Sequence, residues 1–145
     1  MATMMWWPIT SHFHNFLATH EVCTNEEEPI TVRITNLGVR PDTYPAIFII
    51  PEASSGIDFH TKRTGTETLW MEFWTKNDSA DPAEAYASQY AFEEKIYELF
   101  PLWARQAVLD LGLAPVVTVP RRKMAPEKLR PLCAGFALVQ IDWKR

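Results

Sequence analysis

Histidine and cysteine are the residue types of this chain that could bind a metal ion. The chain has four histidines, and His12, His14 and His20 lie close together near its N-terminus. Metal ligands on a helix are spaced by three or four residues, whereas His12 and His14 are two apart and would face nearly opposite directions. The two cysteines, Cys23 and Cys133, match no CxxC motif, so we expect two thiols, with a disulfide as the alternative. We therefore expect no metal site and no cofactor.

Carboxylates could supply general acid and base groups, but nothing in the sequence fixes two of them around a pocket. The acidic run Glu26–Glu28 and the acids of a later helix fit a solvated charged surface. No serine stands in a GxSxG motif, and the five glycines form no phosphate-binding loop. We expect no catalytic residues. A small ligand-binding or enzymatic domain is the alternative, and it would need a concave pocket with convergent polar groups.

Basic residues gather near the C-terminus, between Pro120 and Pro131. Residues 1–60 and 61–110 carry net charges of −5 and −4, whereas residues 111–145 carry +5. The basic run contains Arg121, Arg122, Lys123 and Arg130. Phosphate contacts are one use for such a run, but a pI near 5.5 disfavours tight binding of nucleic acid. We expect this run to dock on an acidic protein surface, with neutralisation inside the subunit as the alternative.

Length and composition favour one globular domain. The chain has 145 residues, of which 47% are hydrophobic and 22% charged. No apolar run approaches the roughly 18 residues that cross a bilayer, and the N-terminus lacks the pattern of a secretory signal. We expect a soluble protein that stays where it is made and has no membrane partner.

Periodicity and turn residues predict the order helix, three strands, long helix, two strands. The predicted elements are a helix over 8–21, strands over 30–34, 44–50 and 66–76, a helix from Asp81 to about Gly112, and strands over 115–119 and 132–143. Pro51 is expected to close the second strand, and Pro101 to kink the long helix. Mobile loops are expected at 52–65 and 120–131.

The long helix has the clearest start signal in the chain, because Asp81 can cap it and Pro82 suits its first turn. Its expected inner stripe is Ala85, Phe92, Ile96, Leu99 and Trp103, with Glu84, Glu93, Glu94 and Glu98 mostly outside.

The strand before this helix alternates between two sets of large residues. Leu69, Met71 and Phe73 should face the core, and Trp70 and Trp74 the opposite side. That second face suits either a partner or simple cover for the sheet within one subunit. Together these elements predict one α+β domain over residues 1–145, with a mainly antiparallel sheet and with the N-terminal helix and the long helix packed on one face.

Five segments carry a resemblance to a known family. They are Pro8–Leu17, Tyr44–Pro51, Glu67–Trp74, the helix Asp81–Trp103 and Gly135–Trp143. In this order the chain resembles the tail terminator and tail completion proteins of long-tailed bacteriophages, also described as minor tail or minor capsid proteins. The resemblance is a pattern of elements over most of the chain, without a catalytic or binding motif.

The resemblance implies a structural protein of the virion tail that assembles in the host cytoplasm. Six copies would form a ring that caps the tail tube and joins it to the head connector, and DNA would at most pass through the ring. A head–tail connector or neck protein is the close alternative. The residues expected at interfaces are Trp70 and Trp74, or Trp6 and Trp7, as buried contacts, and Arg121, Arg122, Lys123 and Arg130 toward an acidic neighbour.

Overall fold

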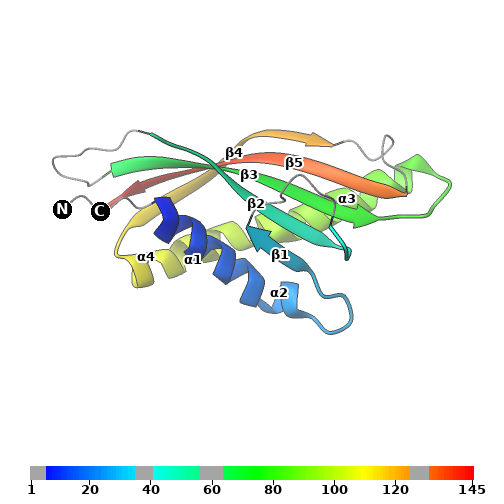
Figure 1. The fold of residues 1–145 in the computed structure, drawn as a ribbon, viewed down its shortest axis with the longest axis horizontal. Coiled ribbons are helices and arrows are strands. Elements are labelled where there is room, and N and C mark those ends of the chain that lie inside the picture. Colours follow the sequence, from blue (N-terminus) through cyan, green and yellow to red (C-terminus); the bar gives the residue numbers. More distant parts are fainter. Residues whose placement is uncertain (1–5, 35–40, 56–63, 125–130) are drawn as a thin grey trace.

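A five-stranded sheet forms the centre of the computed structural model, and helices cover one of its two faces (Figure 1). The structure describes residues 6–34, 41–55, 64–124 and 131–145, without the side chains of Trp6 and Ser55. The elements are α1 (Trp6–Thr19), α2 (Glu21–Thr24), β1 (Thr31–Ile34), β2 (Ala46–Ser55), β3 (Thr64–Lys76), α3 (Pro82–Tyr97), α4 (Leu99–Leu111), β4 (Ala114–Met124) and β5 (Leu132–Lys144).

The strands lie in the order β1-β2-β3-β5-β4. Each neighbouring pair is antiparallel except β1 with β2, which is parallel. The predicted α+β class, the mainly antiparallel sheet and the placement of the helices on one face are therefore confirmed.

Two strands continue through prolines that were predicted to end them, Pro51 in β2 and Pro120 in β4. β2 continues past Pro51, with a bulge between Pro51 and Ala53, so the predicted loop was wrong for residues 52–55 and 64–65. β4 continues past Pro120 to Met124, with a bulge between Thr118 and Arg121. The loop predicted over 120–131 was therefore wrong for residues 120–124. Bulges and sheet edges tolerate proline because no ladder hydrogen bond is needed there. Residues 56–63 and 125–130 of the two predicted loops lie outside the described residues.

The long helical stretch begins and breaks near the predicted residues. The backbone N–H of Ala83 donates to Asp81 Oδ1 at 3.0 Å, and Pro82 occupies the first turn. The stretch divides at Glu98 into α3 and α4, so that Pro101 lies in the first turn of α4, where its missing N–H costs little. Gly112 ends α4 with φ 66°, a left-handed conformation that glycine adopts readily.

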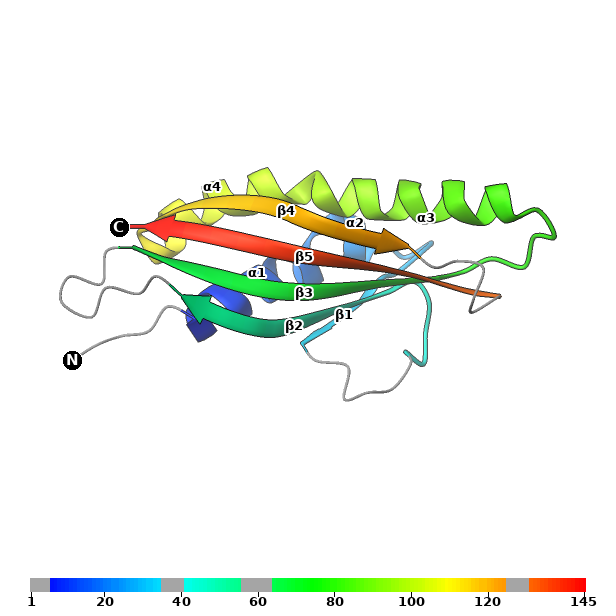
Figure 2. The ribbon, with the colours of Figure 1, turned by 90° about the horizontal axis from the view of Figure 1, so that it is seen from above.

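The main core lies between the sheet and the helices. α1 contributes Ile9, Phe13 and Leu17, which are fully buried at a spacing of four residues. The predicted inner stripe of the long helix is buried, and Leu69, Met71 and Phe73 of β3 face it. Figure 2 shows α1 behind the sheet, and α3 with α4 along the β4 side. The opposite side of the sheet, which we call the open face, carries the alternate side chains of each strand.

Candidate interaction surface

Two rows of side chains cross the open face, and each row ends in a cation on β4. The strand register places Ile50, Trp70, Leu138 and Arg121 side by side on β2, β3, β5 and β4; we call this set the Trp70 row. The next row consists of Phe48, Glu72, Phe136 and Lys123; we call it the Phe136 row. Because partners in register on antiparallel strands point to one side, each row is a continuous strip.

The Trp70 row forms the floor of a hollow of about 540 Å³. Its lining residues are Ile50, Pro51, Glu52, Trp70, Arg121 and Leu138. The ring of Trp70 stacks on Phe136, with centroids 6.4 Å apart and planes 19° from parallel. Trp70 is only half-buried, so a flat aromatic surface remains accessible beside the exposed Arg121. Two residues that the sequence analysis expected at interfaces therefore meet in one hollow.

Trp74 lies on the same face but belongs to a small internal cluster. It is 7% exposed and packs with Phe48 and Ala134. Its indole N–H donates to Glu72 Oε1 at 3.0 Å. Trp74 therefore covers the sheet within the subunit, whereas Trp70 presents its ring to solvent.

Arg122 points away from the open face and forms an internal ion pair. Its Nη2 donates to Glu93 Oε1 at 3.2 Å, and its guanidinium lies over the rings of Tyr90 and Tyr97. Strand alternation thus separates Arg122 from Arg121 and Lys123. Of the predicted basic run, two side chains face the open side, and Arg130 lies outside the described residues.

Glu93 itself is 1% exposed, so the expectation that it lies outside was wrong. Besides Arg122, Gln89 Nε2 donates to its Oε2 at 3.2 Å and the Tyr97 hydroxyl to its Oε1 at 3.0 Å. Burial first, and then the Glu93 carboxylate, raise the pKa of Tyr97, which keeps that hydroxyl protonated as a donor. Gly135 gives Glu93 its space, because a Cβ at Gly135 would collide with the carboxylate. The network binds α3 to the sheet.

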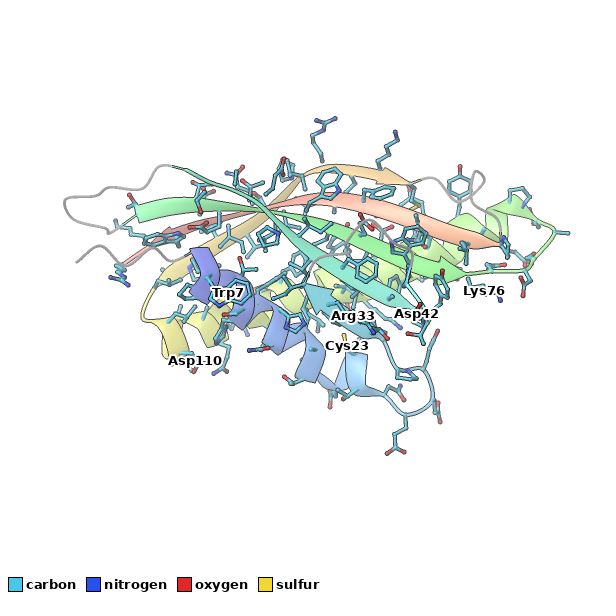
Figure 3. All side chains as sticks on the ribbon, viewed as in Figure 1. Trp7, Cys23, Arg33, Asp42, Lys76 and Asp110 are labelled. Carbon is cyan, nitrogen blue, oxygen red and sulfur yellow. The ribbon has the colours of Figure 1, made fainter. Side chains whose placement is uncertain are left out.

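α1 begins with Trp6 and Trp7, and Figure 3 shows Trp7 in the helical layer and not on the open face. Trp7 is 56% exposed, and the side chain of Trp6 is outside the described part of the chain. The structure therefore does not bring Trp7 together with Trp70.

His12 uses both ring nitrogens inside the subunit. The Trp103 indole N–H donates to Nδ1 of His12 at 3.0 Å, so Nδ1 is an acceptor and the ring proton lies on Nε2. This Nε2–H donates to Asp110 Oδ2 at 2.8 Å. The bond from His12, and then one from Gln106, lower the pKa of Asp110. Because Nδ1 is occupied, the Asp110–His12 pair has no nitrogen to offer a substrate.

The other candidate ligands also have structural surroundings. His14 Nε2 lies 3.0 Å from Val32 O, and His20 Nδ1 accepts from Val22 N at the start of α2. Cys23 and Cys133 are buried thiols, and burial raises the pKa of Cys23 to about 11. Among the described residues, no group of three or more histidines, cysteines and acids could hold a metal ion.

Glu67 is a fully buried carboxylate at one end of the core. The Ser54 hydroxyl and the Trp143 indole N–H donate to it. Burial raises its pKa above the ordinary value of 4.5, and the two hydrogen bonds oppose that shift. A raised pKa means that ionisation of Glu67 is less favourable in the folded chain than in the unfolded chain. Protonated Glu67 therefore contributes stability that is fully present below pH 4.5 and is lost as the pH rises through the pKa of the folded state.

We expect Glu67→Gln to remove this loss of stability with rising pH, because a neutral amide can form hydrogen bonds with the same neighbours, Ser54 and Trp143. Urea unfolding from about pH 4 to pH 8 should show wild type losing stability relative to the variant as pH rises. Glu94→Gln, at an exposed position, is the matched control and should follow wild type. Parallel stability curves for wild type and Glu67→Gln would show that this prediction is wrong.

A second concave site lies at the other end of the sheet, between α3, the start of β2 and the end of β3. It has a volume of about 330 Å³, and Lys76, Lys95, Tyr44 and Glu28 are among its lining residues. Its two lysines could attract an anion, but no paired acid and base groups converge in it.

None of the helices in the described ranges is both long enough and apolar enough to cross a membrane. A scan against protein-family models gives no match for this chain, and a search of curated proteins finds no relative.

Proposed function

We propose that this protein is a non-enzymatic structural subunit of a long-tailed phage, the tail terminator. In this proposal six copies form a ring that caps the tail tube and joins it to the head connector. The tube protein and the connector protein are its partners, and DNA at most passes through the ring. Its place is the tail or neck of the virion, reached by assembly in the host cytoplasm.

The open face is the observation that carries this proposal. Helices cover one side of the sheet, and the other side holds half-buried Trp70, Phe136 and Leu138 beside exposed Arg121 and Lys123. The neighbouring Phe48, Glu72 and Trp74 on that side are buried within the subunit. Aromatic residues and arginine are enriched at the centres of protein interfaces. The surface is therefore suited to binding another protein.

Charge supports a ring in particular. A closed ring uses two different patches on each copy, so the patches can carry opposite charge. Cations end both rows of the open face, whereas exposed acids lie on α3 and in Glu26–Glu28. Figure 1 shows the connection from α2 to β1 and the β4 strand at opposite sides of the molecule. The order of elements on which the family resemblance rests is also the order of the folded chain.

The pocket beside Lys76 and Lys95 favours a second candidate, a small ligand-binding domain. A head–tail connector or neck protein would use the same open face at a different place in the particle.

Electron microscopy of tail tubes from the phage that encodes the chain tests the proposal. We expect purified protein to add a ring-shaped cap at one end of the tubes. The variant Trp70→Asp should leave most ends bare, because it places a charge in the apolar floor of the hollow. Leu109→Asp, at an exposed site on α4 away from the open face, is the control. Tubes that stay bare with wild-type protein would contradict the terminator role.

A further inference from the structure

We infer that the open face of one copy binds the outer side of α3 of the next copy in the ring. This inference rests on the proposed function and names the two surfaces of the contact between subunits. The outer side of α3 presents Ala83, Ala87, Ala91 and Glu94, and Glu98, the residue that follows α3, continues this side; we call these five residues the α3 stripe.

The α3 stripe is one continuous, exposed side of the helix. Its members are spaced by three or four residues, and all five are exposed. They lie opposite Ala85, Gln89 and Ile96, which are buried against the sheet. The first three members are small and apolar, so a flat surface can approach the helix backbone closely, and the last two are acids. The stripe thus has an apolar half and an anionic half.

The open face has the same division across its width. From β2 to β5 the Trp70 row is apolar, and at β4 it ends in Arg121, with Lys123 ending the Phe136 row. The three steps from Ile50 to Arg121 span about 14 Å at the usual spacing between strands. From Ala83 to Glu94 the helix rises about 16 Å. Alanines placed over Ile50, Trp70 and Leu138 therefore bring Glu94 to Arg121.

Opposite charges favour contact between the acidic half of the α3 stripe and β4. Arg121 and Lys123 are exposed on the β4 side of the hollow, and Glu52 lies on the β2 side. Glu94 and Glu98 are therefore attracted to the β4 side of the hollow and repelled by the β2 side. Arg122 takes no part, because its guanidinium is bound to Glu93 within the subunit.

Two different surfaces of one chain make this contact heterologous. In Figure 2 the sheet is seen from its open face, while α3 runs along the β4 side in the layer behind it. Every copy can therefore offer its α3 stripe to one neighbour and its open face to the other. The acidic run Glu26–Glu28 is the competing anionic surface, but it lies in a connection without a row of small apolar residues beside it.

Charge reversal of each surface, followed by mixing, tests the contact. Open-face variant Arg121→Glu/Lys123→Glu and stripe variant Glu94→Lys/Glu98→Lys each place like charges across it. We expect either one alone to need at least about tenfold more protein than wild type for half-assembly, measured by light scattering. In an equal mixture the two variants alternate around the ring, every contact regains opposite charges, and assembly returns.

Two controls make the test specific. Glu26→Lys/Glu27→Lys, mixed with the open-face variant, should not restore assembly, and Arg105→Glu, at an exposed site on α4, should assemble as wild type does. Circular dichroism checks that each variant is folded. If the open-face reversal is not folded, Arg121→Gln/Lys123→Gln replaces it, and if the stripe reversal is not folded, Glu94→Gln/Glu98→Gln replaces it. Rings that form normally from the open-face variant, or no recovery in the mixture with the stripe variant, would overturn this inference while the ring itself stands. Wild-type protein that forms no ring, alone or on tubes, would instead refute the proposed function.

Discussion

Trp103→Ala should lower the free energy of unfolding by about 3–5 kcal/mol, the usual range for removing a large aromatic side chain from a core. Trp103 is fully buried, and its ring meets Phe13 edge to face with centroids 5.1 Å apart. Its indole N–H also donates to His12, so the change removes packing and a hydrogen bond between α1 and α4. Urea unfolding followed by circular dichroism measures the loss.

Two variants separate these contributions. Trp103→Phe keeps much of the packing and removes the donor to His12, so a loss of about 1 kcal/mol is expected for the hydrogen bond, together with a smaller packing cost. Trp7→Ala, at a residue that is 56% exposed, should have little effect. Equal losses for Trp103→Ala and Trp7→Ala would contradict the packing described for α1 and α4.

Glu93→Ala should cost about 3 kcal/mol, the lower end of the range for breaking a buried ion pair, because Arg122 is partly exposed and can regain water. The change removes the acceptor for Arg122, for Tyr97 and for one N–H of Gln89, which also donates to Phe73 O. Thermal and urea unfolding measure the effect, and Glu94→Ala on the exposed side of α3 is the control.

Gly135 supplies an independent check on this network. Gly135→Ala should destabilise wild type, because its Cβ meets the Glu93 carboxylate, but it should cost much less in the Glu93→Ala background, where that carboxylate is gone. Additive effects of the two changes would show that Gly135 is not needed for the space it gives Glu93.

The elements were predictable from the sequence where local signals agree. The cap at Asp81 and the alternation of Leu69, Met71 and Phe73 each set position and facing before any tertiary contact is known. The extension of β2 through Pro51 was not predictable from the sequence. Proline ends a strand only where the sheet needs a backbone N–H at that position, and the sequence does not reveal where a bulge removes this need.

Trp70 and Arg121 were expected at interfaces, but their meeting in one hollow was not foreseen, since that depends on the pairing of β3, β5 and β4. Arg122 was predicted to lie with Arg121 and Lys123 in one basic loop. These residues belong to β4 instead, where side chains alternate between the two faces of the sheet, so Arg122 points to the helical face and pairs with Glu93. Glu93 has the sequence surroundings of an exposed helix acid, and only Gly135, which is distant in the chain, makes its burial possible.

The mass of the assembled protein tests the ring proposal most directly. It should be measured by sedimentation velocity over a concentration series, both for free protein and for protein cross-linked on tail tubes and then released. The account predicts a species of about 100 kDa, six chains of 16.7 kDa each, in the tube-bound sample and at high concentration in solution. A 16.7 kDa monomer in every sample would contradict it and turn attention to the pocket beside Lys76 and Lys95.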